Sequence, residues 1–106
     1  MTKAGKVDCG MFCEVVGKSP RNAILEFFLE GRELDYGLGD VSRELGLNRA
    51  TTYNVTGDLI KEKFIIPSRK IGKTQLYKFN AKEDKGKLLI RIFNEILKEG
   101  IKDYAS

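Results

Sequence analysis

Apolar positions follow helical spacing in two stretches near the start of the chain. Residues 11–16 predict one or two amphipathic turns that end at the next glycine. Ser19 and Pro20 then open a longer helix, because serine caps a helix N-terminus and proline at the first helical position loses no hydrogen bond. Apolar residues repeat along 24–29 on one face of this helix, and Gly31 is expected to end it.

A shorter helix is predicted over residues 40–45, where two apolar side chains stand one turn apart. Gly46 breaks this helix, and Leu47 is placed to fill the core. The loop before it contains two glycines, and Leu38 in that loop is expected to pair briefly as a strand. The pattern therefore predicts two short helical segments separated by a tight turn.

Asn48 is well suited to cap a third helix over residues 49–63. The residues expected to face the core are Thr52, Val55, Thr56, Leu59 and Ile60. The residues expected to face outward are Arg49, Thr51, Tyr53, Asn54 and Lys61. The outer face of this helix thus carries hydrogen-bonding and cationic groups.

Two strand-like runs follow the third helix. Residues 64–66 are aromatic and β-branched, and residues 75–79 alternate between polar and apolar side chains. The connection 68–74 is basic and contains Gly72, so the two runs predict an antiparallel β-hairpin with a tight tip. Pro67 cannot donate a ladder hydrogen bond, which makes the first run an edge strand or introduces a kink in it.

Residues 83–104 predict a long terminal helix. At 100° per residue its apolar side chains cover roughly half of the circumference, which is wider than the ~100° stripe that one domain face needs. One flank is therefore expected to pack on its own domain and another to meet a second chain. The residues expected at that dimer contact are Leu89, Ile90, Phe93, Ile96, Leu97, Ile101 and Tyr104.

The composition is that of a small globular protein. The chain has 106 residues, of which 42% are apolar and 32% are charged. Three segments are expected: an N-terminal segment 1–14, a domain 15–80 and a terminal helix 81–106.

No run approaches the roughly 18 apolar residues of a membrane span, and no secretory signal is visible, so a cytoplasmic protein is expected. The absence of histidine excludes histidine-dependent triads, and neither an enzyme nor a cofactor is expected.

The positive charge is concentrated in the third helix and the hairpin. Residues 48–80 hold seven lysines and arginines against two acids, whereas residues 19–47 hold three against six. The net charge of the whole chain is only +4. This asymmetry favours a polyanionic partner such as nucleic acid, although a solvated basic face would give the same pattern.

Two short helices, a glycine turn and a basic hairpin, in this order, resemble a winged helix-turn-helix. The similarity is closest in residues 40–52. There Ser42 stands at a small-residue position, Gly46 at a turn glycine and Leu47 at a buried apolar position. Asn48 stands where such proteins usually place a capping serine. The chain is thus similar to the ArsR/MarR-type transcriptional regulators.

The resemblance covers most of the chain. Residues 15–25 are similar to the entry into the first helix of that family, and residues 64–79 to its strand, wing and strand. Three positions depart from the pattern: Lys63 stands where a glycine usually ends the recognition helix, and Thr52 and Thr56 replace aliphatic core residues. The family's metal-sensing cysteine and histidine motifs are absent.

The resemblance implies a mostly α-helical winged helix-turn-helix with a small antiparallel hairpin and a long C-terminal dimerisation helix. It also implies a dimeric, sequence-specific regulator that reads the major groove of double-stranded DNA with helix 49–63. The wing 68–74 would contact the DNA backbone or the minor groove. The residues expected to bind DNA are Asn48, Arg49, Ala50, Thr51, Tyr53, Asn54, Arg69, Lys70 and Lys73.

Other functions stay open at this point. A winged helix also serves as a protein-interaction module, or as a DNA-segregation adaptor that binds DNA and recruits other proteins. Cys9 and Cys13 stand four positions apart and offer two soft ligands for a metal or redox switch, but they fill only half of a tetrahedral site unless a dimer supplies four. The simpler interpretation is a pair of buried, reduced cysteines without a chemical role.

Overall fold

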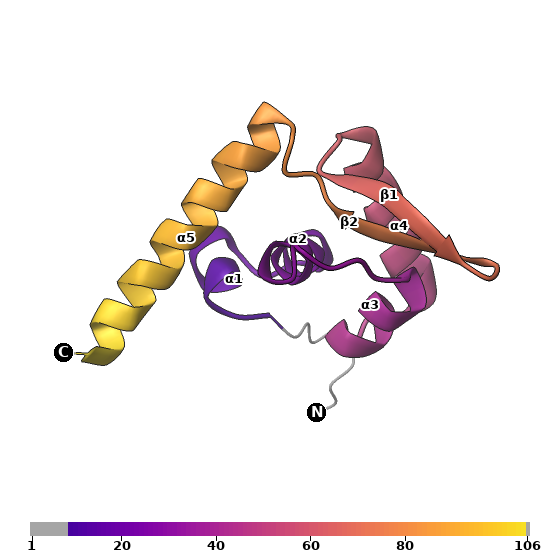
Figure 1. Ribbon diagram of the computed structural model, residues 1–106. Coiled ribbons are helices and arrows are strands. Elements are labelled where there is room, and N and C mark those ends of the chain that lie inside the picture. Colours follow the sequence, from indigo (N-terminus) through magenta and orange to yellow (C-terminus); the bar gives the residue numbers. More distant parts are fainter. Residues whose placement is uncertain (1–8, 106) are drawn as a thin grey trace, which may run out of the picture.

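The computed structural model describes the backbone of residues 9–105 and the side chains of residues 9–100. Five helices and one two-stranded antiparallel sheet make up this part of the chain (Figure 1). The elements are α1 (Met11–Val16), α2 (Pro20–Glu30), α3 (Leu38–Leu45), α4 (Arg49–Lys61), β1 (Ile65–Ile71), β2 (Thr74–Phe79) and α5 (Asp84–Ala105). The predicted fold class, mostly helical with a small hairpin and a long last helix, is confirmed.

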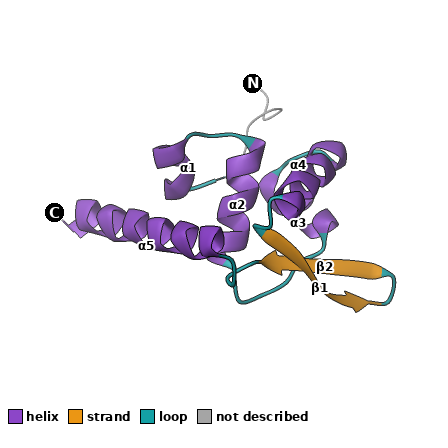
Figure 2. Cartoon of the chain, turned by 90° about the horizontal axis from the view of Figure 1, so that it is seen from above, coloured by secondary structure: helices purple, strands orange, loops and turns teal. Residues whose placement is uncertain are grey.

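Helix α2 lies at the centre of the molecule, between α5 on one side and α3, α4 and the hairpin on the other (Figures 1 and 2). Its N-terminus forms as predicted: the Ser19 Oγ accepts a hydrogen bond from the Asn22 N–H at 3.0 Å, and Pro20 is the first helical residue. Gly31 ends the helix. Because α2 has neighbours on several sides, it is buried over more than one stripe.

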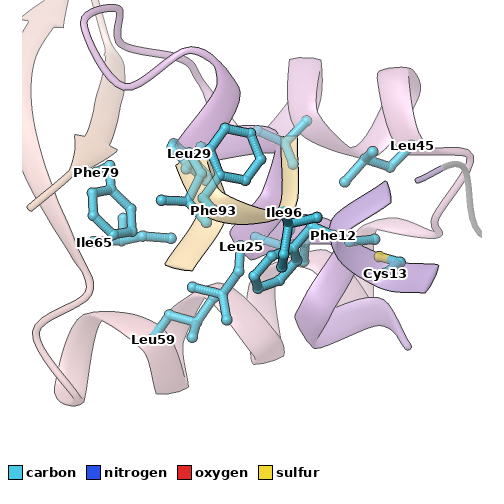
Figure 3. Packing of buried hydrophobic residues seen from close by; sticks show 14 residues of the cluster. Phe12, Cys13, Leu25, Leu29, Leu45, Leu59, Ile65, Phe79, Phe93 and Ile96 are labelled. Atoms are coloured by element: carbon cyan, nitrogen blue, oxygen red, sulfur yellow. The ribbon is translucent and has the colours of Figure 1, made fainter. Parts of the chain in front are cut away.

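The hydrophobic core gathers around α2 and draws side chains from every helix and both strands (Figure 3). Phe12 of α1 reaches Phe93 of α5, with ring centroids 6.2 Å apart. Each large apolar side chain buried in this way contributes about 1.5–3 kcal/mol to stability. The fully or nearly fully buried apolar residues include Phe12, Ala23, Ile24, Leu25, Phe28, Leu29, Val41, Leu45, Leu59, Ile65, Phe79, Phe93 and Ile96.

The turn between α3 and α4 is held by a left-handed glycine and by one serine. Gly46 has φ +67°, a conformation that side chains rarely adopt. The buried Ser42 donates its hydroxyl to the Leu47 carbonyl at 2.6 Å, and the Leu47 N–H donates to the Ser42 carbonyl at 3.1 Å. The expectation for Leu38 is wrong: it is the first residue of α3, and the short pairing in this loop is made instead by Tyr36 with Tyr77.

Helix α4 begins at its predicted cap, because the Asn48 Oδ1 accepts a hydrogen bond from the Thr51 N–H at 2.7 Å. It ends two residues earlier than predicted, at Lys61. Lys63 has φ +69°, a left-handed backbone conformation that glycine adopts most easily. This conformation explains why the similar regulators usually have a glycine where this chain has Lys63. At the same end of α4, Arg21 of α2 forms a two-pronged ion pair with Glu62, with nitrogen–oxygen distances of 2.6 and 3.2 Å.

The hairpin is longer and its tip is tighter than predicted. Residues 68–71 continue β1 and Thr74 opens β2, so only two of the residues 68–74 lie between the strands. Gly72 has φ +62° at this tip. The register shifts between Pro67 and Lys70, which confirms the predicted irregularity at the proline.

A disulfide joins Cys9 to Cys13, with the Cα atoms 6.0 Å apart. The interpretation of these residues as reduced cysteines is therefore wrong for this structure. Cys13, in the first turn of α1, is 1% exposed, and Cys9, just before that helix, is half-buried. Spacing of four residues fits both a pair of thiols and a disulfide, so the sequence could not distinguish them.

Two buried threonines of α4 provide a matched test of the core. The Thr52 hydroxyl donates to the Asn48 carbonyl at 2.9 Å, whereas the Thr56 hydroxyl has no hydrogen-bond partner among the described residues. Thr56→Val should raise the free energy of unfolding by about 1 kcal/mol, because it removes an unsatisfied buried hydroxyl. Thr52→Val should lower it by about 1 kcal/mol, since a hydrogen bond is lost. Urea unfolding of both variants measures the difference, and a Thr56→Val variant less stable than the parent would show that the Thr56 hydroxyl is satisfied after all.

Candidate nucleic-acid interface

The N-terminal half of α4 presents a polar face to solvent because its opposite face is buried. Thr52, Thr56 and Leu59 are inaccessible and point toward the core, as predicted. The residues left on the outer side are those expected to bind DNA: Asn48, Arg49, Ala50, Tyr53 and Asn54 are exposed, and Thr51 is half-buried. A helix packed through one face leaves these side chains free to meet a partner.

Arg49 and Tyr53 contact each other one turn apart on this face. The Arg49 guanidinium lies 5.8 Å from the centre of the Tyr53 ring, and its Nη2 donates a hydrogen bond to the phenol oxygen at 3.4 Å. No carboxylate pairs with Arg49 among the side chains of residues 9–100. The guanidinium is therefore oriented by an uncharged neighbour and keeps its positive charge available.

The three basic residues of the hairpin do not have equal surroundings. Lys70 and Lys73 are exposed and form no ion pair with any side chain that the structure describes. Arg69 instead pairs with Asp35, with its Nε and Nη2 donating to the carboxylate at 3.0 and 3.3 Å. The Ser68 hydroxyl donates to the same carboxylate at 2.5 Å.

Asp35 is not among the residues expected at the site, although it ties the hairpin to the loop before α3. Its hydrogen bonds from Arg69 and Ser68 lower the pKa of its carboxyl group, and the same pairing raises the pKa of Arg69. Thirty-four positions separate Asp35 from Arg69, and no local pattern in the sequence marks the pair. The pair can be recognised only from the folded structure, in which the hairpin lies beside the loop before α3.

A hollow of about 380 Å³ separates α4 from the hairpin. Its lining comes from the start of α3, the start of α4, the hairpin tip and β2, so the polar face of α4 and the hairpin border the same depression. Arg43 pairs with Asp40 at its edge, which leaves Arg49 and Lys73 as the cations of the lining without an ion pair in the described structure. The lining residues are Gly37, Leu38, Gly39, Asp40, Arg43, Arg49, Tyr53, Lys73, Thr74, Gln75 and Tyr77.

The residues expected at a dimer contact lie mostly against the chain's own core. Phe93 and Ile96 are buried there, and Leu89, Ile90 and Leu97 are half-buried against it. The side chains of Ile101 and Tyr104 lie outside the described residues. Among the described side chains of α5, the large apolar residues left exposed are Leu88 (49%) and Ile92 (40%). Val15 of α1, which is 65% exposed, lines the same surface hollow as Ile92.

The described residues were also compared with the requirements of a membrane span and of a metal site. None of the described helices is long and apolar enough to cross a membrane. Among the described residues, one group combines side chains suited to metal binding: the sulfurs of Cys9 and Cys13 and a carboxylate oxygen of Glu26 lie within 4.8 Å of one another. Cys9 precedes α1, Cys13 is in α1 and Glu26 is in α2, so this group is separate from the polar face of α4.

Comparison with known proteins identifies the helix-turn-helix in sequence as well as in structure. The IclR helix-turn-helix domain matches residues 23–65, which run from within α2 to the first residue of β1. No curated protein matches the chain. The helix-turn-helix is thus confirmed, whereas the ArsR/MarR type stays a prediction.

Solved structures with the same fold include several bacterial proteins. MepR, a transcription regulator of the Staphylococcus aureus multidrug efflux pump MepA, has a TM-score of 0.65 at 13% identity, over 90% of this chain and 70% of that one. The transcriptional regulator HlyU from Vibrio vulnificus has a TM-score of 0.59 at 14% identity, over 81% and 83%.

A mutant of Lactococcus lactis ZitR has a TM-score of 0.63 at 16% identity, over 83% of this chain, which spans little more than half (57%) of that protein. A MepR mutant bound to an oligodeoxyribonucleotide is also similar, with a TM-score of 0.63 at 13% identity, over 90% of this chain and 68% of that one. These likenesses establish a winged helix-turn-helix, in which α3 and α4 form the helix pair and the hairpin forms the wing.

The pKa of Asp35 tests whether Arg69 of β1 is held by the loop before α3. The pair is intact above the ordinary aspartate pKa of about 4 and is lost as the pH falls through the lowered value. Arg69→Met should raise the pKa of Asp35 toward that ordinary value, whereas Lys70→Met should leave it low. Carboxyl ¹³C NMR titration measures both, and an Asp35 pKa that does not respond to Arg69→Met would refute the pairing.

Proposed function

We propose that this protein is a sequence-specific double-stranded DNA-binding protein that acts as a dimeric transcriptional regulator. The observation that carries the proposal is the placement of the exposed, polar outer face of α4 beside a hairpin whose Lys70 and Lys73 have no ion-pair partner among the described residues. The shared fold with transcription regulators, one of them bound to an oligodeoxyribonucleotide, supports it.

Sequence would be read by the first turns of α4 in the major groove. Arg49 can donate two parallel hydrogen bonds to guanine, and Asn54 can pair with adenine. Thr51 can contact a thymine methyl group or a phosphate, and Tyr53 can donate to a phosphate while it supports the Arg49 guanidinium. Asn48 and Ala50 would lie at the same surface, where Ala50 allows close approach.

The hairpin would contribute charge rather than base recognition. Lys70 and Lys73 would meet the phosphate backbone or the edge of the minor groove, where cations replace the counterions of DNA. Arg69 keeps a 67% exposed side chain while it is paired with Asp35. Its contact with DNA would therefore be weaker than that of an unpaired arginine, and its main role would be to hold the wing in position.

A dimer would form through α5 and the neighbouring part of α1. The exposed Leu88 and Ile92 of α5 and Val15 of α1 would be buried between two chains, while Phe93 and Ile96 keep α5 attached to its own domain. A two-fold axis at this contact would place two copies of α4 in successive major grooves, about one helical turn of DNA apart. The DNA site would then be a pseudo-palindrome.

The wing assignment is tested by charge reversal with a matched control. Lys70→Glu/Lys73→Glu should weaken binding to mixed-sequence duplex DNA by on the order of 10- to 100-fold at physiological salt, and should reduce the slope of log affinity against log salt by about 2. The control, Lys82→Glu/Lys87→Glu, changes the net charge equally at positions near the start of α5. Fluorescence anisotropy across a salt series gives both quantities.

Equal losses in the two double variants would show a general charge effect and would contradict the wing contact. A parent protein that binds no duplex DNA at low salt would contradict the proposed function itself and would favour a protein-interaction module.

A further inference from the structure

Three side chains with metal-ligand chemistry meet at the first turn of α1, away from α4 and the hairpin. The sulfurs of Cys9 and Cys13 and an oxygen of Glu26 lie within 4.8 Å of one another. Cys13 is 1% exposed and Glu26 is 4% exposed, whereas Cys9 is half-buried and gives the group access to solvent. Figure 3 shows Cys13 beside Phe12, at the edge of the core.

Glu26 is a buried carboxylate that has no lysine or arginine partner among the described side chains. Its Oε1 accepts a hydrogen bond from the Gly10 N–H at 2.6 Å, and its Oε2 accepts one from the Phe12 N–H at 3.2 Å. These bonds compensate part of the cost of burying the group, and they orient the carboxylate toward the first turn of α1. Each oxygen keeps a further lone pair with which it can bind a cation held by the two cysteines.

We propose that Cys9, Cys13 and Glu26 form a thiol-gated site for a thiophilic divalent cation of the Zn²⁺ class. Two thiolates and one carboxylate are a ligand set that zinc accepts, with metal–sulfur bonds of about 2.3 Å and metal–oxygen bonds of about 2.0–2.2 Å. Three protein ligands leave the fourth tetrahedral position to water, so the bound ion is exchangeable. The site requires one chain only, unlike a site built from two cysteine pairs.

The disulfide form of this site does not bind the cation, because the two sulfurs are bonded to each other and neither is a thiolate. A small-molecule dithiol or phosphine reductant opens it. With a dithiol, the Cys9–Cys13 sulfur–sulfur bond breaks, two protein thiols form, and the dithiol becomes a cyclic disulfide after giving up two electrons and two protons. The cation then displaces the two thiol protons into solvent and binds the resulting thiolates.

The site lies at the first turn of α1, and α1 packs on α5. Phe12, between the two cysteines in sequence, contacts Phe93 of α5 with ring centroids 6.2 Å apart. A change between disulfide and metal-bound forms therefore acts on the part of α1 that supports the terminal helix. The proposal does not depend on DNA binding, because the experiment that tests it measures binding of the metal ion to the chain.

Cobalt(II) is a suitable probe, because cobalt in a tetrahedral thiolate site gives sulfur-to-metal charge-transfer absorption and intense visible bands. The full chain, reduced with a phosphine under anaerobic conditions, should bind one Co²⁺ per chain with both features, and Zn²⁺ should displace it. The oxidised chain should show neither feature.

Cys13→Ser should abolish the charge-transfer band, and Glu26→Gln should weaken Co²⁺ binding at least about 10-fold. The matched control, Glu44→Gln at an exposed position of α3, should bind as the parent does.

A second readout needs no variant and covers the case in which Glu26→Gln fails to fold, which far-UV circular dichroism detects. In the reduced parent chain, Zn²⁺ should slow alkylation of Cys9 and Cys13 by iodoacetamide, and a chelator should restore the rate. Absence of a charge-transfer band, or alkylation that ignores Zn²⁺, would overturn the site. A folded Glu26→Gln variant with parental affinity would overturn the three-ligand set.

Discussion

The packing of α4 across α2 decides which residues of α4 reach solvent, and the remaining features of the surface depend on it. Thr52, Thr56 and Leu59 occupy the buried side, so the other side must carry the polar residues. Two further constraints fix the helix along its axis. The Asn48 cap sets where it begins, and the ion pair between Arg21 and Glu62 joins its far end to α2.

The hairpin is useful to a DNA-binding surface only if its position relative to α4 is constant. A two-stranded sheet is weakly stable alone, so the body of the protein has to hold it. Two contacts do so from the loop before α3: Tyr36 exchanges backbone hydrogen bonds of 2.8 Å with Tyr77, and Asp35 pairs with Arg69. The cations that remain without a partner in the described structure, Lys70 and Lys73, then extend from a fixed base.

Local patterns predict most of the fold, and long-range contacts account for what they miss. The cap at Asn48, the left-handed turn at Gly46 and the register shift after Pro67 each depend on one or two neighbouring residues, so the sequence shows them directly. The partner of Arg69 is 34 positions away, and no local pattern reveals it. Periodicity likewise does not show which part of a wide apolar face covers the chain's own core: Phe93 and Ile96 of α5 are buried there, and the dimer contact stays a prediction.

Selection of bound sequences from a pool of random duplexes tests the central claim, that the outer face of α4 reads DNA, most directly. The parent chain should select a pseudo-palindrome with half-sites about one helical turn apart, and Arg49→Ala should lose the preference at one position in each half-site and keep it elsewhere. Selection of no consensus by the parent, or the same consensus by Arg49→Ala and the parent, would contradict the claim.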